Sequence, residues 1–296
     1  MYKTASINYQ KSKNILLVKN FYNLMKPRVM SLVVFTALVG LVISKNQIDF
    51  VSSILALFFV AAGAGAAGTL NMWYDSEIDA IMSRTCLRPI PLGKISNNQA
   101  LYFGIFLTLV SVIGLYLVSN ILSASILALT ISFYIFVYTI WLIGGAAGAF
   151  PPVIGWTISN NSLSIEPIVL FLIIFFWTPS HFWSLSLYKS DDYKKADIPM
   201  LPVVSGVEFT KKNIFIYALI LFPITILPFY FNFAGLIYLI PALILGLTYI
   251  FLTYQLLKAK NKINEEKYSK KIFAFSILYL FLIFSLLLIE SFFKIF

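Results

Sequence analysis

The chain has 296 residues, of which 60% are hydrophobic and 11% are charged, and its formal net charge at pH 7 is +10. Ordinary soluble domains carry about 25% charged residues, so this composition excludes a soluble globular protein and predicts an integral membrane protein. A positive net charge also characterises nucleic-acid-binding proteins, but the positions of the basic residues along this chain exclude that class.

The apolar residues form separate runs of about 17 to 22 residues. A helix of about 20 residues crosses the hydrocarbon core and satisfies its own backbone hydrogen bonds, so we expect helices. The predicted fold is all-α: a polytopic membrane bundle of about nine transmembrane helices. A polar leader, residues 1–28, precedes a single transmembrane domain, residues 29–296. The expected spans are residues 29–45, 50–70, 100–118, 121–141, 142–159, 166–186, 213–231, 235–256 and 272–292.

The basic residues lie on alternate loops between these spans. With the N-terminus in the cytoplasm, 20 of the 22 Lys and Arg residues are cytoplasmic, and only Lys45 and Lys294 are outside. This bias predicts a multi-pass protein of the bacterial inner membrane with a cytoplasmic N-terminus. The leader has no Arg before Arg28, which makes the mitochondrial inner membrane the weaker alternative. The charge therefore indicates contact with the anionic surface of a lipid bilayer and no nucleic acid.

One pair of expected spans has no polar loop between its members. Residues 121–159 contain no charged residue, and only glycines and prolines interrupt them. A reversal would have to use Gly144 and Gly145 in a nearly loopless turn. The alternatives are that the spans are shorter than drawn, or that the chain lacks a segment here. If the two spans formed one tilted crossing, every later loop would be inverted.

The stretch NMWYDSEIDAIMSRTCLR, residues 71–88, follows the second apolar run. Asn71, Asp75 and Asp79 are four residues apart, so on a continuous helix their side chains share one face. Such oxygen ligands suit Mg²⁺, and Arg84 and Arg88 could grip phosphate oxygens. Interfacial charges at a helix end are the alternative, but the whole set, in a chain with 12 acidic residues, favours a site for a diphosphate.

The loop after the sixth span carries a second polar cluster. It contains Asp191 and Asp192 with Lys189 and Lys195, and it follows the single histidine, His181. An ionisable residue inside an apolar span is a functional candidate by default. A histidine that is only hydrogen-bonded to a neighbouring helix is the alternative.

Three stretches, NMWYDSEIDAIMSRTCLRP, GGAAGAFPPVIGW and WTPSHFWSLSLYKSDDYKKADIPMLPVV, resemble the signatures of the protoheme IX farnesyltransferases (heme O synthases), within the UbiA-type intramembrane prenyltransferases. The similarity runs from about Lys26 to the last span. It implies a helical bundle around a central cavity, with two Asp-bearing loops on the cytoplasmic side. The implied reaction joins the farnesyl group of farnesyl diphosphate to a vinyl group of heme b, with addition of water, giving heme O.

The resemblance also implies roles for the polar residues. Mg²⁺ would be held by Asn71, Asp75 and Asp79, with Asp191 and Asp192 across the cavity. Because Lys195 lies inside the stretch DDYKKAD, the sequence does not decide which of Asp191, Asp192 and Asp197 binds metal. Charge on the leaving diphosphate would be stabilised by Arg84, Arg88 and Lys195, and Lys189 would also bind substrate. We expect His181 to contact the heme, either by axial ligation of its iron or by a hydrogen bond to a propionate.

Aromatic faces could shelter an allylic cation, and Trp73, Tyr74, Tyr138 and Tyr193 are available for this role. Core packing is the alternative for each of them, and in a chain with 28 Phe it holds for most. The implied pathway suggests contact with heme A synthase or terminal oxidase assembly factors. The family usually places a short basic loop between the fourth and fifth spans, and this chain departs from that pattern.

Two other functions are compatible with parts of the sequence. One is prenyl transfer to an aromatic acid or quinone precursor, against which His181 argues because a phenolic acceptor does not require an imidazole. The other is membrane transport. Transporters often contain internal repeats and place their sites at the midplane, whereas this chain shows no convincing repeat and gathers its acidic groups at one surface.

Overall fold

The computed structural model describes residues 16–44, 46, 48–136 and 144–293. Over these residues the chain forms helices and no strand, which confirms the all-α prediction. Six helices are long and apolar enough to cross a membrane, or seven if the helix Leu16–Leu24 and α2, which are bent by 51°, form one span. The expected count of nine is therefore approximate. The bent pair ends with α2 (Pro27–Ile43). The six long helices are α3 (Phe50–Tyr74), α5 (Asn97–Val118), α9 (Ile165–Tyr188), α12 (Val207–Ile224, continued by α13, Leu227–Tyr230), α14 (Leu236–Lys258) and α15 (Lys262–Phe293).

The fourth and fifth expected spans correspond to shorter helices: α6 (Ile121–Phe136), α7 (Gly144–Ala149) and α8 (Pro151–Asn160). The side-chain nitrogen of Asn120 donates hydrogen bonds to the carbonyl oxygens of Thr157 at 2.7 Å and Ile158 at 3.1 Å. Because the start of α6 thus lies beside the end of α8, the chain leaves this end of the bundle and returns to it. The single tilted crossing is wrong. The turn expected at Gly144 and Gly145 is wrong as well, since both glycines belong to α7; residues 137–143 lie outside the described residues.

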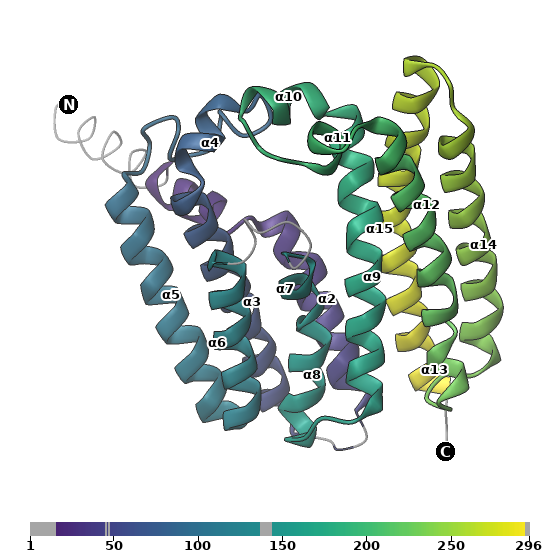
Figure 1. Cartoon of the computed structure of the whole chain (residues 1–296). Helices are drawn as coiled ribbons and strands as arrows, with labels where there is room; N and C mark the ends of the chain where they lie inside the picture. Colours follow the sequence, from purple (N-terminus) through teal and green to yellow (C-terminus); the bar gives the residue numbers. More distant parts are fainter. Residues whose placement is uncertain (1–15, 45, 47, 137–143, 294–296) are drawn as a thin grey trace, which may run out of the picture.

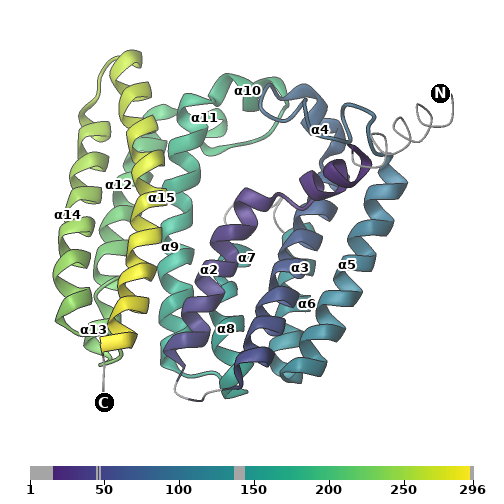
Figure 2. The same ribbon diagram turned by 180° about the vertical axis from the view of Figure 1, so that it is seen from behind.

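The helices form two groups with α2 and α8 between them (Figures 1 and 2). One hydrophobic core gathers residues of α3, α5 and α6 with α2 and α8, and the other gathers mainly residues of α9, α12, α14 and α15. Three short helices lie together at one end of the bundle (Figure 1): α4 (Ser76–Ile81), α10 (Ser190–Lys195) and α11 (Leu201–Val204).

Two glycines allow α2 and α8 to pack backbone against backbone. A Cβ atom on Gly155 of α8 would overlap the carbonyl oxygen of Ala37, and one on Gly40 of α2 would overlap the carbonyl oxygen of Pro152. Small residues at a membrane helix interface permit such close approach. This contact fixes α2 beside α8, where both helices form a wall of the cavity described below.

Buried polar contacts fix the ends of the last three long helices. Lys211, at the start of α12, donates to the Ala259 carbonyl at 2.8 Å and to Glu265 at 2.9 Å. At the other end, Glu290 accepts a hydrogen bond from the backbone N–H of Tyr238 at 2.7 Å. Helices α14 and α15 are therefore antiparallel, and the loop between them lies at the same end as α10, as the alternation of basic loops predicts (Figure 1). The sidedness of the membrane stays a prediction.

Candidate active site

The predicted row of polar residues lies where α3 ends. Asp75 terminates α3, but hydrogen bonds from Asp75 N to Asn71 O at 2.9 Å and from Asp79 N to Asp75 O at 2.8 Å keep the helical spacing into α4. The side-chain nitrogen of Asn71 donates to the Asp75 carboxylate at 2.6 Å. Asn71 and Asp79 are both buried. The expectation that these three side chains share one face is consistent with this geometry.

Lys26 joins this cluster, although sequence reasoning assigned it no role beyond its charge. Its ammonium donates to the side-chain oxygen of Asn71 at 2.5 Å. Lys26 is in the left-handed conformation immediately before α2, at the 51° bend. Pro27 disfavours a helical conformation for the preceding residue, so the bend and the position of Lys26 have a local cause. The Lys-Pro pair at the start of the first span was the signal available in the sequence.

The Lys26 side chain is partly buried among other charged groups. Burial is the largest of the effects that together lower the pKa of Lys26 to about 7; the nearby Arg88 guanidinium acts in the same direction, while Asp79 and Asp75 oppose it. The ammonium therefore lacks enough negative charge around it. An anion bound beside Lys26 would supply that charge.

The two predicted arginines point to different parts of the site. Arg88 forms an ion pair with the buried carboxylate of Asp79 at 2.5 Å. Arg84 directly follows Ser83, whose hydroxyl contacts Asp192 of the second polar loop. The phosphate-binding role expected of both arginines stays a prediction.

The two polar loops contact each other, as the shared-site prediction requires. Ser83 donates a hydrogen bond to the carboxylate of Asp192 in α10. Beside it, the buried ring of Tyr193 packs in a small hydrophobic cluster with Met82 and Ala196. This contact joins the segment after α4 to α10 above the ends of α3 and α9 (Figure 1).

The other predicted site residues of the second loop, Lys189, Asp191 and Lys195, make no described contact with the first loop. Asp191 and Lys195 are exposed, and Lys189 is half-buried at the end of α9. Among the residues that the structure describes, no group of three or more His, Cys, Asp or Glu side chains could hold a metal ion. Asp191 and Asp192 therefore do not form one cluster with Asp75 and Asp79. Their roles, and that of Lys195, stay predictions.

The first cluster has the ligands that Mg²⁺ requires from a protein. Burial raises the pKa of Asp75, and repulsion from Asp79 adds to this effect, while the hydrogen bond from Asn71 opposes it. A divalent cation would relieve this repulsion. Mg²⁺ is usually bound by one or two carboxylates and completes its shell with waters and substrate phosphates. The metal-binding role of Asn71, Asp75 and Asp79 stays a prediction.

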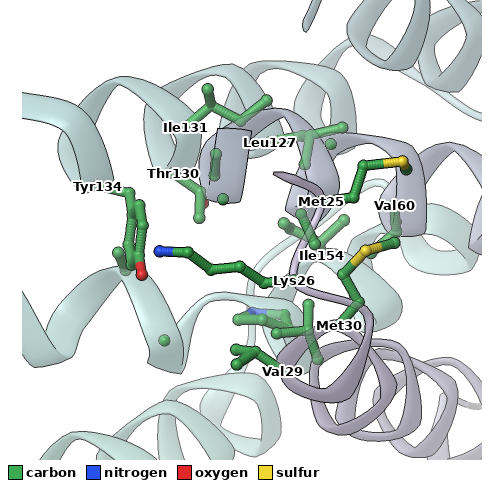
Figure 3. Close-up of a pocket in the computed structure, with 18 residues that line it drawn as sticks. Met25, Lys26, Val29, Met30, Val60, Leu127, Thr130, Ile131, Tyr134 and Ile154 are labelled. Atoms are coloured by element: carbon green, nitrogen blue, oxygen red, sulfur yellow. The ribbon is translucent and has the colours of Figure 1, made fainter. Parts of the chain in front are cut away.

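An apolar cavity opens beside Lys26 (Figure 3). The cavity is partly open to its surroundings. Its walls come from α2, α3, α6, α7 and α8, and most are aliphatic side chains such as Val33, Leu127 and Ile154. The ammonium of Lys26 points toward Tyr134 of α6 across this cavity (Figure 3). The cavity therefore combines a cationic end with hydrocarbon walls.

The aromatic residues expected to shelter a cation have different positions. Trp73 is half-buried, Tyr74 is 53% exposed and Tyr193 packs between the two loops. Tyr138 lies outside the described residues. The structure instead places Tyr134 in the cavity wall, which the sequence did not indicate because aromatic residues recur throughout the apolar runs. The cation-sheltering roles stay predictions.

His181 lies on α9 and faces α15. Its ring stacks between Trp177, at a centroid distance of 4.3 Å, and Phe273, at 4.7 Å. Its Nδ1 atom is 2.6 Å from the Ser276 hydroxyl oxygen. A hydrogen bond to a neighbouring helix, one of the two interpretations left open by the sequence, is therefore present.

Comparisons with known proteins show the family and the fold of this chain. The profile of the UbiA prenyltransferase family matches residues 33–278. Among curated relatives, the protoheme IX farnesyltransferase of Pelagibacter ubique is 58% identical over 94% of this chain and 95% of its own length. The enzyme of the same name from Parvibaculum lavamentivorans is 50% identical over 92% of this chain and 89% of its own.

Solved structures share the fold at low sequence identity. A structure described for digeranylgeranylglyceryl phosphate synthase has a TM-score of 0.76 and 21% identity, covering 93% of this chain and 98% of that one. A UbiA homologue from Archaeoglobus fulgidus, bound to GPP and Mg²⁺, has a TM-score of 0.66 and 17% identity, covering 90% and 99%. These matches remove the transporter alternative, and the chain belongs to the UbiA prenyltransferase family.

Proposed function

We propose that this chain transfers the farnesyl group of farnesyl diphosphate to a vinyl group of heme b, giving heme O. The observation that carries the proposal is the cluster of Lys26, Asn71 and Asp75 beside an apolar cavity. A prenyl diphosphate is a highly charged head on a long hydrocarbon, and such a ligand requires both environments side by side. The names of the relatives supply the farnesyl donor and the heme acceptor.

The charged groups would bind the diphosphate and stabilise it as it leaves. Asn71, Asp75 and Asp79 would hold Mg²⁺, which neutralises charge on the phosphate oxygens. Lys26, Arg84 and Arg88 would donate hydrogen bonds to the remaining oxygens. Donors that are already fixed in a buried site stabilise developing negative charge without reorganisation, and in many enzymes this stabilisation supplies most of the rate enhancement.

The cavity would hold the hydrocarbon and keep water from the donor carbon until the acceptor is in place. The C1–O bond of farnesyl diphosphate breaks, and the diphosphate leaves with the electron pair. C1 then bonds to the terminal vinyl carbon of heme b, and the positive charge moves to the vinyl carbon next to the porphyrin. Water adds there and loses a proton, so that one diphosphate and one proton are released for each heme O.

The location and the protein partners belong to the same proposal. We propose that α4 and α10 lie on the cytoplasmic side of a bacterial inner membrane, which the charge bias and the bacterial origin of the named relatives support. Contact with heme A synthase or terminal oxidase assembly factors stays a prediction.

A reconstituted assay tests the proposal. The purified chain in lipid nanodiscs is supplied with farnesyl diphosphate, heme b and Mg²⁺, and the products are identified by mass spectrometry. The expected product has the mass of heme b plus one farnesyl group and one hydroxyl group. Transfer of a prenyl group to an aromatic acid or quinone precursor, with heme b unchanged, would contradict the proposed acceptor.

A further inference from the structure

The imidazole of His181 is held in one orientation. The ring lies nearly parallel to the rings on both sides, with interplanar angles of 18° to Trp177 and 22° to Phe273. The indole N–H of Trp177 donates to the Ser276 carbonyl at 2.8 Å, which fixes one of these two rings to α15. A side chain whose ring is enclosed on both faces cannot turn without displacing its neighbours.

The hydrogen bonds around Ser276 determine which ring nitrogen carries the proton. The Ser276 hydroxyl donates to the backbone carbonyl of Phe273 at 2.7 Å, and a hydroxyl has one proton to give. Ser276 is fully buried. Nδ1 of His181 is 2.6 Å from the same oxygen, so with that proton on the Phe273 carbonyl we assign Nδ1 as the donor of the second contact. Only the tautomer with its proton on Nδ1 satisfies both hydrogen bonds.

The other nitrogen, Nε2, then carries a lone pair and no proton. Nε2 has no hydrogen-bond partner among the described residues. Unlike the Trp156 indole nitrogen, it does not belong to the fully buried side-chain atoms that lack a partner. A nitrogen in this state can bind a metal ion or accept a hydrogen bond. It cannot donate a hydrogen bond to a heme propionate, so this arrangement disfavours the propionate as its partner.

Metal-ligating histidines commonly donate their second ring N–H to an oxygen, which fixes the tautomer and the ring orientation. The contact between His181 and Ser276 has this form. We propose that Nε2 of His181 is an axial ligand to the iron of the acceptor heme and that Ser276 is a positioning residue for it. This inference rests on the proposed function, because it assumes that heme is the acceptor.

Heme titration of the full chain in nanodiscs tests the assignment. Ferric heme b is added to the wild type and to His181→Ala, and absorbance and electron paramagnetic resonance spectra are recorded. The wild type should show a histidine-ligated iron. His181→Ala should lose that signature and regain it when free imidazole is added. Both proteins should bind farnesyl diphosphate with the same affinity, which shows that the variant is folded.

The positioning role of Ser276 has its own controls. Ser276→Ala should weaken heme affinity by about 10- to 100-fold, the usual effect of removing the partner of a metal-bound histidine. Ser276→Thr, which keeps the hydroxyl, should restore the affinity. Ser269→Ala removes another fully buried hydroxyl of α15, one without a partner, and should leave heme affinity unchanged.

A wild-type spectrum identical to that of His181→Ala would overturn the ligand assignment. Heme O formation, measured on the same samples, separates the two proposals. If the wild type makes heme O without histidine ligation, the assignment fails and the proposed function stands. If it prenylates another acceptor and does not bind heme, both fail.

Discussion

Replacing Lys26 by methionine would remove one charge from the site while keeping a side chain of similar length. Lys26 lines the cavity, and its ammonium contacts Asn71 at 2.5 Å. If this group binds the diphosphate, the variant should lose affinity for farnesyl diphosphate. The exposed Lys19, on the helix before α2, gives a matched control as Lys19→Met.

The size of the effect follows from the kind of contact that is lost. A hydrogen bond to a charged group contributes about 1.5–3 kcal/mol, and each factor of ten corresponds to about 1.4 kcal/mol. We therefore expect Lys26→Met to weaken farnesyl diphosphate binding by about ten- to a hundredfold. Loss of one preorganised electrostatic donor lowers kcat by about a hundredfold or more. Lys26→Arg, which keeps the charge, should recover part of both losses.

The stability of the variant distinguishes substrate binding from a structural role. The pKa of Lys26 is lowered to about 7, mainly by burial, so the folded chain holds this charge at a cost in free energy. Lys26→Met should then unfold at the wild-type temperature or above it. Affinity measured by calorimetry in nanodiscs, with thermal unfolding followed by fluorescence, tests both statements. Wild-type affinity in Lys26→Met would refute the reasoning, as would an equal loss in Lys19→Met.

Three further predictions concern the metal, the helix packing and the topology. EDTA should abolish activity and added Mg²⁺ restore it, and Asp75→Ala should lower the rate by about a hundredfold because a charged metal ligand is lost; full turnover in chelator would contradict this. Gly155→Leu should lower the unfolding temperature, because even a Cβ atom there overlaps the Ala37 carbonyl; an unchanged temperature would contradict the α2–α8 packing. Reporter fusions should place Lys260 in the cytoplasm and a tag after the C-terminus outside, and the same side for both would refute the ninth span.

Local spacing made part of the site predictable. Asn71, Asp75 and Asp79 lie four residues apart, and the hydrogen bonds across the end of α3 preserve that periodicity. The number of expected membrane spans between the two polar loops predicted that both loops lie at the same end of the bundle. This prediction holds because α6 and α8 run in opposite directions, although the reversal does not use Gly144 and Gly145.

Other features depend on tertiary contacts that no local pattern encodes. Lys26 reaches the site through the bend before α2, and Tyr134 reaches the cavity because of how α6 packs. In a chain with 28 Phe and 17 Tyr residues, nothing in the sequence separates Tyr134 from aromatic residues that face lipid. The Ser83 contact with Asp192 likewise joins residues that are far apart in the chain, so the sequence could not show which second-loop carboxylate meets the first loop.

Photoaffinity labelling tests most directly whether the diphosphate lies at the Lys26 cluster with its hydrocarbon in the cavity. The probe is a farnesyl diphosphate analogue with a diazirine on its last isoprene unit, and labelled peptides are mapped by mass spectrometry. We expect labels on cavity residues such as Val33, Leu127 and Ile154, with protection by excess farnesyl diphosphate and weaker labelling of Lys26→Met. Labels confined to α12 and α14, or labels that excess farnesyl diphosphate does not reduce, would contradict the proposed site.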